Sequence, residues 1–417
     1  MNRREVKRAP VLRFKGFTND WEQRKLIEIL KSSVTDGPHE TPQILKKGVP
    51  FISVEAIVNN KIDFNRKRGY ISFSYNAQCN KKYRPQKKDV LLVKSGSTVG
   101  KVAVVETNTI FNIWSPLAAL RVTNSNDPYF LYYLLQTNTL QRQIINKSKG
   151  GTQPNLSMRI LEQFKIFLPQ NYLNQQKIEQ LLRTLDKCIS LQQRKLELLK
   201  LFKIGMLQNI LADTKAASKL KFKGSNQEWR PRRLNSITNI ITKGTTPHFK
   251  QASNGVNFIK IEDISKDNGK IYPRSFITEK ENNGYLKRSQ LKAGDLLFSI
   301  AGTLGRVGKV TDDILPANTN QALAIIRLKP SQNIDFCKIM LESDSVKRYI
   351  HANPTMGAQP NLSLKQISDL TLFFPDIKEQ TLISQLIKKI DNLLALQYQN
   401  ISKFKQLKQF LLQNIFI

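Results

Sequence analysis

Apolar residues recur at alternating three- and four-residue steps along two long stretches of the chain, residues 174–211 and 379–416. This spacing forms a heptad seam, so each stretch predicts one long amphipathic helix. The seam of the first stretch consists of Leu185, Ile189, Leu196, Leu199, Met206 and Ile210. The seam of the second consists of Ile387, Ile390, Leu394, Ile401, Phe404, Leu411 and Ile415.

The two predicted helices repeat one another. The polar breaks in the first seam, Gln192 and Lys203, return about 205 residues later as Gln397 and Lys408. Both helices also end on the same residues, Leu-Gln-Asn-Ile. A lone helix would leave its seam in water, so we expect the two copies to pair antiparallel within one chain. Pairing of the seams between two chains is the alternative.

The chain before the first helix returns between the two helices. Residues 51–57 alternate as a strand does, and residues 258–264 repeat the pattern. Two short strands around a glycine turn are predicted from residue 89 and again from residue 295. Two further short sequence motifs, called words below, are repeated. Phe14-Lys15-Gly16 with Trp21 returns as Phe222-Lys223-Gly224 with Trp229. Gln153-Pro154-Asn155-Leu156-Ser157 returns as Gln359-Pro360-Asn361-Leu362-Ser363. The chain therefore predicts one α+β domain followed by one long helix, written twice.

Some elements and boundaries follow from local composition. Residues 127–147 are rich in aromatic residues and leucine and predict one helix, and residues 164–168 predict a final strand. A polar, alanine-rich stretch near residues 213–218 separates the repeats. We expect a first domain at 1–170, a central helix at 171–213, a second domain at 214–376 and a C-terminal helix at 377–417.

The repeated Gln-Pro-Asn-Leu-Ser word predicts a helix start in each domain. Ser363 is followed three residues later by Gln366, the pattern of a capping box. Ser157 has Ile160 at that position and can cap only through its own hydroxyl. We interpret both words as structural junctions, with contact to a partner as the alternative.

The net charge of the chain indicates what kind of partner it binds. The 417 residues include 66 Lys and Arg against 32 Asp and Glu, a formal net charge of +34. This excess indicates a polyanionic partner, with nucleic acid ahead of a membrane surface. No apolar run is long enough to span a bilayer and no signal core follows the N-terminus, so we expect a cytoplasmic protein.

The basic stretches differ between the two repeats, although the scaffold words match. Two similar frames with different basic surfaces are expected if each frame recognises a different DNA sequence. A histidine after each repeated turn, following Pro38 and Pro247, could be presented to DNA as well. The alternative is that these side chains form ordinary solvated faces. The candidate DNA-binding residues are His39, Arg66, Lys67, Arg68, Lys81, Lys82, Arg84, His248, Lys270, Arg274, Lys287 and Arg288.

The chain shows no constellation for catalysis, metal binding or cofactor binding. Residues 95–101 resemble a phosphate-binding loop, but the first glycine is missing and Val102 replaces the magnesium-binding Ser or Thr. The three cysteines, Cys79, Cys188 and Cys337, lack the spacing of a zinc site, and we expect three buried thiols. We predict a chain that binds without performing chemistry.

Together these features resemble the specificity subunit of type I restriction-modification systems. The resemblance rests on two variable domains, each followed by a long helix, and covers nearly the whole chain. Its words are Gly-Gly-Thr-Gln-Pro-Asn-Leu-Ser at 150–157, Gly-Ala-Gln-Pro-Asn-Leu-Ser at 357–363 and the paired helix endings.

The resemblance implies that the domains at 1–170 and 214–376 are target-recognition domains that each recognise half of a bipartite duplex target. The helices would act as spacers that set the gap and dock partners. It also implies two methyltransferase subunits with S-adenosylmethionine and two ATP-dependent restriction subunits with ATP and magnesium.

Two alternatives belong to other classes of protein. An enzyme acting alone would need a carboxylate cluster or a cofactor loop, and the purified chain would alter DNA. A coiled-coil adaptor with basic domains for RNA or ribosomes would bind nucleic acid with low sequence preference. The resemblance does not identify individual DNA contacts, so the candidate residues rest on charge alone.

Overall fold

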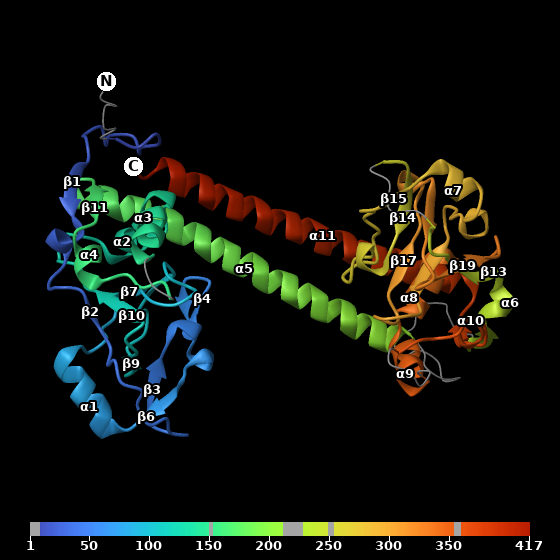
Figure 1. Ribbon diagram of the computed structural model, residues 1–417, viewed down its shortest axis with the longest axis horizontal. Coiled ribbons are helices and arrows are strands. Elements are labelled where there is room, and N and C mark those ends of the chain that lie inside the picture. Colours follow the sequence, from blue (N-terminus) through green and yellow to red (C-terminus); the bar gives the residue numbers. More distant parts are fainter. Residues whose placement is uncertain (1–8, 150–152, 212–227, 249–253, 354–359) are drawn as a thin grey trace. The chain divides into compact units, whose positions relative to one another are not determined.

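The computed structural model describes residues 9–149, 153–211, 228–248, 254–353 and 360–417 (Figure 1). The chain forms two compact units: unit 1 is Met1–Gln193 with Gln399–Ile417, and unit 2 is Arg194–Tyr398. Both combine helices and sheets, so the predicted α+β class is confirmed. The repeated word at 222–224, the starts of the words at 150–152 and 357–359, and the boundary near 213–218 lie outside the described residues.

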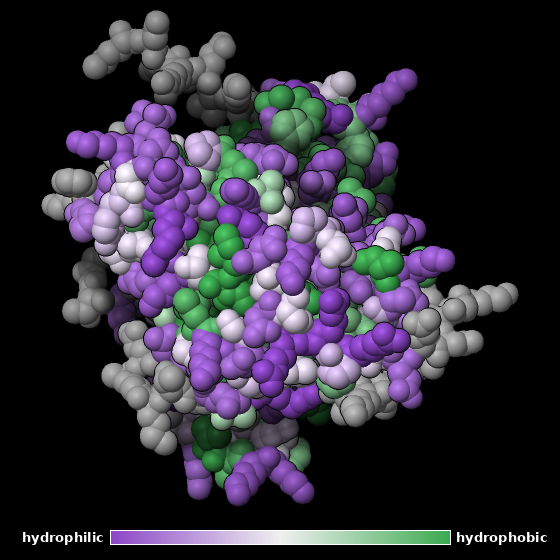
Figure 2. Space-filling model, turned by 90° about the vertical axis from the view of Figure 1, so that its right-hand side faces the viewer, coloured by the Kyte–Doolittle hydropathy of each residue, from purple (hydrophilic) through white to green (hydrophobic). Residues whose placement is uncertain are grey.

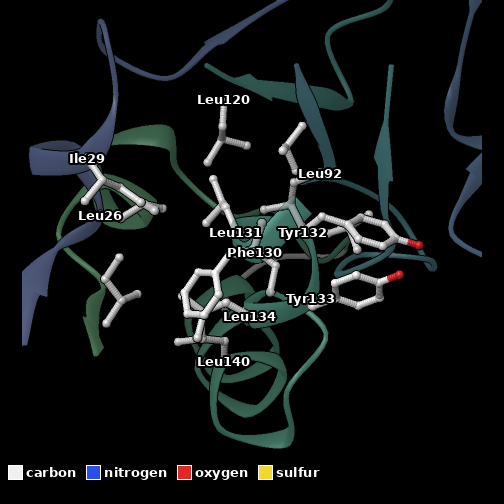
Figure 3. Packing of buried hydrophobic residues seen from close by; sticks show 14 of the residues in the cluster. Leu26, Ile29, Leu92, Leu120, Phe130, Leu131, Tyr132, Tyr133, Leu134 and Leu140 are labelled. Atoms are coloured by element: carbon white, nitrogen blue, oxygen red, sulfur yellow. The ribbon is translucent and has the colours of Figure 1, made fainter. Parts of the chain in front are cut away.

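Unit 1 is built on a four-stranded antiparallel sheet. Its order is β2 (Thr35–Asp36), β10 (Leu117–Leu120), β7 (Val90–Val93) and β8 (Val102–Val104). The pairing of β7 with β8 confirms the predicted strands around a glycine turn. Every residue of β7, β8 and β10 is buried, because successive side chains enter hydrophobic clusters on opposite faces. Figure 3 shows Leu92 and Leu120 beside Leu131 on one of these faces.

A smaller sheet extends unit 1. It consists of β6 (Gly69–Ile71), β3 (Val49–Ile52) and β9 (Asn112–Ile113), followed by α1 (Phe73–Lys82) and accompanied by η3 (Phe64–Arg66). A hairpin of β4 (Ile57–Val58) with β5 (Lys61–Ile62) lies between β3 and η3 in sequence. The prediction of one strand over residues 51–57 is wrong. The strand ends at Ile52, and η2 (Val54–Ala56) follows because the Ala56 N–H bonds back to the Ser53 carbonyl (3.0 Å).

The helices of unit 1 cover the main sheet. They are α2 (Pro128–Leu134), α3 (Asn138–Ser148) and α4 (Met158–Glu162), with η1 (Leu26–Ile29). The predicted single helix over 127–147 is wrong, because the Thr137 hydroxyl caps a new helix at the Leu140 N–H. The predicted final strand is present as β11 (Lys165–Leu168), which pairs with β1 (Glu22–Lys25).

Unit 2 repeats this arrangement. Its main sheet has the order β13 (Thr238–Lys243), β19 (Leu323–Leu328), β16 (Leu296–Ser299) and β17 (Val307–Lys309). Its smaller sheet is β15 (Phe276–Ile277), β14 (Val256–Ile259) and β18 (Ala317–Thr319), and β12 (Arg230–Arg233) pairs with β20 (Thr371–Phe374). Its shorter helices are α6 (Leu234–Ile237), η4 (Ile261–Asp263), α7 (Glu279–Asn283), η5 (Lys287–Ser289), η6 (Asp312–Ile314), α8 (Ile334–Leu341), α9 (Asp344–Ala352) and α10 (Leu364–Ser368). Here too the strand predicted over 258–264 ends early, at Ile259.

The two long helices are α5 (Tyr172–Ile210) and α11 (Ile377–Asn414). In unit 1, Lys408 Nζ lies 2.6 Å from Asp186 Oδ1, and in unit 2 Lys203 Nζ lies 2.6 Å from Asp391 Oδ1. Since the end of α11 meets α5 in unit 1 and its beginning meets α5 in unit 2, the helices pair antiparallel within one chain, as expected. The two lysines that interrupt the seams therefore make ion pairs.

The predicted seam residues lie on or near the covered faces of these helices. Buried are Leu185, Ile189, Ile210, Ile387, Ile390, Leu394, Ile401 and Ile415, and partly buried are Leu196, Leu199, Met206, Phe404 and Leu411. No helix in the described part of the chain is long and apolar enough to cross a membrane.

The repeated Gln-Pro-Asn-Leu-Ser words join each glycine turn to a short helix. The Leu156 N–H donates to the Lys94 carbonyl (2.7 Å), and the Leu362 N–H donates to the Ile300 carbonyl (2.8 Å). The capping box of Ser363 with Gln366 is confirmed. The expected cap by Ser157 is wrong: its hydroxyl makes no capping hydrogen bond.

The prediction of three buried thiols holds only for Cys337, because Cys79 and Cys188 are partly exposed. Burial raises the pKa of the Cys337 thiol to about 12, so this thiol stays protonated at neutral pH. The two other thiols lie where α1 and α5 each have one side in solvent.

Candidate nucleic-acid interface

The predicted contact residues of unit 1 lie around the smaller sheet. Arg66 ends η3, Arg68 precedes β6, and Lys81 and Lys82 end α1. Figure 1 shows α1, β3, β6 and β9 together at the side of unit 1 away from α5. All seven candidates in this unit are exposed except Lys67, which is partly exposed. Figure 2 faces unit 2 rather than unit 1, and the surface that it shows is mostly hydrophilic, with apolar side chains between the hydrophilic ones.

A buried carboxylate organises two of these candidates. The Asp36 side chain is fully buried and accepts a hydrogen bond from Lys82 Nζ. His39 Nε2 lies 3.1 Å and Lys94 Nζ lies 3.2 Å from the same carboxyl group. Two lysines around one carboxylate leave a net positive charge, which suits a phosphate. Charge reasoning missed Asp36 and Lys94, although a lysine directly after the apolar run Val90–Val93 was an available signal.

The turn that carries His39 crosses the end of β9 at close range. A Cβ on Gly37 would lie 1.8 Å from the carbonyl oxygen of Ile113, so only glycine fits. At the equivalent place in unit 2, a Cβ on Gly244 would lie 2.1 Å from the Thr319 carbonyl oxygen. In both units, therefore, the turn needs glycine because it passes too close to a neighbouring carbonyl to leave room for a side chain.

An aromatic support holds Arg68. Its guanidinium carbon lies 3.9 Å from the centroid of the Trp114 ring. The Trp114 indole N–H donates to the Glu40 carbonyl (3.2 Å), and the Tyr75 hydroxyl donates to the Glu40 carboxylate (3.0 Å). Burial, and then the contact with Glu40, raises the pKa of Tyr75, so this hydroxyl remains a donor. Charge reasoning found Arg68 but missed Trp114, Glu40 and Tyr75.

The remaining candidates of unit 1 have weaker supports. Arg66 Nε lies 3.8 Å from Asp63, and Lys67 Nζ lies 4.9 Å from the centroid of Tyr70. Within the described part of the chain, the Lys81 and Arg84 side chains have no ion-pair partner. The exposed contacts of Arg66 and Lys67 contribute little to stability. All four side chains are therefore available to a ligand.

The candidates of unit 2 belong to two segments. The centroids of the His248 and Tyr285 rings lie 3.8 Å apart, and the backbone N–H of His248 donates to the Glu281 carboxylate (2.9 Å). The exposed residues Lys287 and Arg288 follow Tyr285 in η5.

The second segment lies between η4 and β15. In it Lys270 lies over the Tyr272 ring (5.6 Å) and Arg274 Nε lies 3.9 Å from Asp263. Charge reasoning missed Tyr272, although it lies only two residues from Lys270 in sequence.

The arrangement can bind a polyanion. Exposed cations lie over aromatic rings or around a buried carboxylate, and these supports reduce the entropy lost when a side chain is fixed on a ligand. In the part of the chain that the structure describes, no three His, Cys, Asp or Glu side chains are grouped so that they could hold a metal ion.

Comparisons with known proteins agree with this geometry. The family described as type I restriction modification DNA specificity domain matches residues 18–201 and 226–406. The MjaVIII specificity subunit of Methanocaldococcus jannaschii is 24% identical over 405 residues, which cover 94% of this chain and 90% of that protein. The putative MjaX specificity subunit of the same organism is 24% identical over 409 residues, 94% of this chain and 91% of its own length.

Solved structures show the same fold. The S subunit from M. genitalium has a TM-score of 0.61 at 16% identity, over 98% of this chain and 99% of that one. A structure described in terms of the complex assembly and conformational transition of the type I R-M system also has a TM-score of 0.61 at 16% identity, over 94% and 96% of the two chains.

Proposed function

The chain belongs to the type I restriction-modification DNA specificity subunits, and from this premise we propose that each of its two α+β domains recognises one half of a bipartite duplex target. The observation that carries the proposal is the difference between the two repeats. The same frame presents a stacked arginine and an aspartate–lysine cluster in unit 1, but a histidine–tyrosine stack in unit 2. Two different surfaces on one frame favour two different half-sequences.

The contact residues proposed from charge are the twelve candidates His39, Arg66, Lys67, Arg68, Lys81, Lys82, Arg84, His248, Lys270, Arg274, Lys287 and Arg288. Each phosphate that they neutralise should lower log affinity by roughly 0.9 per unit of log salt. Several such contacts in each domain predict a slope of several units. The formal net charge of +34 supports this mode of binding.

The long helices are proposed to dock the methyltransferase subunits. Besides burying their seams, both helices expose large apolar residues to solvent. In α5 these include Leu191, Leu198, Leu201 and Phe202, and in α11 they include Leu393, Leu396, Leu407 and Phe410. Large apolar side chains left in solvent along both helices support packing of partner helices.

We propose that the chain itself is not catalytic. S-adenosylmethionine would be bound by two methyltransferase subunits, and ATP with magnesium by two restriction subunits. The chain would supply sequence recognition and spacing. The adaptor of low sequence preference is the competing hypothesis, and it predicts no conserved motif in bound duplexes.

Selection from random duplexes tests the proposal. The full chain, purified from its own cells with its methyltransferase, should enrich a bipartite motif with an unread gap. Enrichment without any motif would support the adaptor, and methylation or cleavage by the isolated chain would contradict a non-catalytic subunit.

The helices should also set the gap. Four residues inserted after Ile210 lengthen α5 by about 6 Å, and a four-residue insertion is a recognised interruption of heptad repeats. At about 3.4 Å per base pair, the gap should grow by one or two pairs. The control is a four-residue insertion in the loop at Ser125, outside the helices. An unchanged gap in an active variant would contradict this role.

A further inference from the structure

Arg68 and Arg274 occupy equivalent positions in the two units. Arg68 directly precedes β6, which pairs with β3, and Arg274 lies just before β15, which pairs with β14 in the same way. The parallel strands β9 and β18 complete the equivalence through a buried asparagine in each, Asn112 and Asn318. Each asparagine side chain accepts a hydrogen bond from the next residue's N–H (2.9 Å).

The residue two positions after each asparagine differs. In unit 1 it is Trp114, whose backbone N–H donates to Ile52 (2.9 Å) and whose indole donates to the Glu40 carbonyl. Hydrogen bonds therefore hold Trp114 both at its backbone and at the edge of its ring. Arg68 lies over this ring, and its backbone N–H donates to the Phe51 carbonyl (2.9 Å). Both the start of the Arg68 side chain and its guanidinium are thus held in place.

The Arg68 guanidinium keeps its donors available. Among the residues that the structure describes, no side-chain or backbone oxygen accepts a hydrogen bond from it, whereas Arg66 lies near Asp63 and Lys82 is bound to Asp36. A planar guanidinium presents its N–H groups in a fork that matches two adjacent acceptors. When one face is supported by a ring, little freedom remains to be lost on binding.

In unit 2 the equivalent arginine has different surroundings. Asn320 replaces the tryptophan, and its side-chain oxygen accepts from the Ala322 N–H (3.1 Å). Arg274 has no ring at this place and lies 3.9 Å from the carboxylate of Asp263, which is buried. That carboxylate would oppose the approach of an electronegative base edge and offsets the charge of Arg274.

We propose that Arg68 is a specificity-determining residue that recognises one guanine in the half-site of unit 1, with Trp114 as its positioning residue. Guanine presents O6 and N7 side by side in the major groove, and a bidentate arginine is the commonest specific contact with it. Arg274 has no such role in the other half-site. The inference rests on the proposed function, because it assumes that unit 1 recognises a half-site.

The experiment is the same duplex selection with the wild-type complex, Arg68→Ala, Arg68→Lys and the matched control Arg274→Ala. The wild-type motif should contain a guanine in one half. In Arg68→Ala and Arg68→Lys, preference for that guanine over other bases should fall roughly 10- to 100-fold, while every other position and the whole second half stay unchanged. Arg274→Ala should retain both halves and bind all sequences slightly less tightly.

Variants at the ring test the positioning role. Trp114→Phe keeps an aromatic face and should retain the guanine preference, whereas Trp114→Ala should lose most of it without changing the salt dependence of binding. The unchanged second half-site reports in every case that the chain is folded and assembled.

The outcomes separate the two proposals. A wild-type complex that selects no bipartite motif contradicts the proposed function. A wild-type motif with no base preference altered by Arg68→Ala, or a uniform loss of affinity for all sequences, overturns the guanine contact and leaves Arg68 a phosphate contact. Loss of a base preference in Arg274→Ala equal to that in Arg68→Ala overturns the difference between the two arginines.

Discussion

The two units place the same residue type at the same point of the fold and surround it differently. Arg68 lies over a tryptophan that a distant strand supplies, and Arg274 lies near a buried carboxylate. A similar contrast separates Asp36 and Lys243, which precede the equivalent glycines Gly37 and Gly244. The frame is therefore fixed by its strands and glycines, and the chemistry presented to a ligand is set by neighbours that differ between the repeats.

Exchange of one domain should have the largest effect on this comparison. Replacing residues 214–376 with the matching domain of a related specificity subunit should change one half of the recognised motif completely and leave the other half intact. The reason is that each unit has its own hydrophobic core and its own basic surface. Duplex selection measures the result, and a folded variant in which both halves change would contradict independent recognition.

The cores of the two units should respond differently to loss of their closing apolar residue. Phe416 is buried in unit 1, with its ring 5.2 Å from Phe130 and 6.2 Å from Trp21. Leu211, about 205 residues earlier, is only partly buried in unit 2. Phe416→Ala should destabilise unit 1 by about 3–5 kcal/mol, and Leu211→Ala should destabilise unit 2 by less than about 2 kcal/mol.

Hydrogen exchange of the main-sheet amides in each unit measures these losses separately, because it reports local stability. Phe416→Leu is the matched control, since it keeps most of the apolar volume. Equal destabilisation of the two units by the alanine variants would show that the C-terminal residues do not close unit 1.

The buried carboxylate of Asp36 is replaced by a lysine, Lys243, at the equivalent position of unit 2. Asp36→Asn leaves Lys94, with only 9% of its side chain exposed, beside Lys82 without a balancing charge. Loss of one partner of a buried pair costs about 3–5 kcal/mol, and the exposure of Lys82 places this variant at or below the lower end. Lys243→Ala at the equivalent position should change stability by less than about 0.5 kcal/mol.

Exchange of the β2 and β10 amides provides the readout for unit 1. If Asp36→Asn left their protection unchanged while weakening DNA binding, the cluster would serve the ligand alone and not the fold.

The loss of stability should differ least between the two units when the ion pairs of the long helices are broken. Lys203 and Lys408 are equivalent, and each pair should contribute about 1 kcal/mol or less. Asp186 also accepts a hydrogen bond from the Tyr133 hydroxyl (2.9 Å). Lys408→Met should therefore cost slightly less than Lys203→Met, because Asp186 keeps one partner. Double-mutant cycles with Asp186→Asn and Asp391→Asn would measure each coupling, and a larger coupling in unit 1 would contradict this order.

The sequence alone determined the repeat, the α+β class and the two long helices, and it favoured their antiparallel pairing within one chain over pairing between chains. A heptad seam is a local and periodic signal, and its repetition with Lys203 and Lys408 in register shows that the two helices are copies of one another. Local signals were less reliable where a hydrogen bond redirects the chain. The strand predicted over 51–57 ends at Ile52, and the helix predicted over 127–147 is interrupted at Thr137.

Only the tertiary structure decided how the candidate contacts are supported. Charge selected Arg68 and Lys82 but gave no reason to separate them, because a basic residue looks the same in sequence whether it is free, stacked or paired. Trp114 and Asp36 come from distant segments, and only the pairing of β3 with β9 and of β2 with β10 brings them to these side chains. The chemistry of an exposed cation depends on neighbours within a few ångströms, and the fold, not the spacing in sequence, chooses those neighbours.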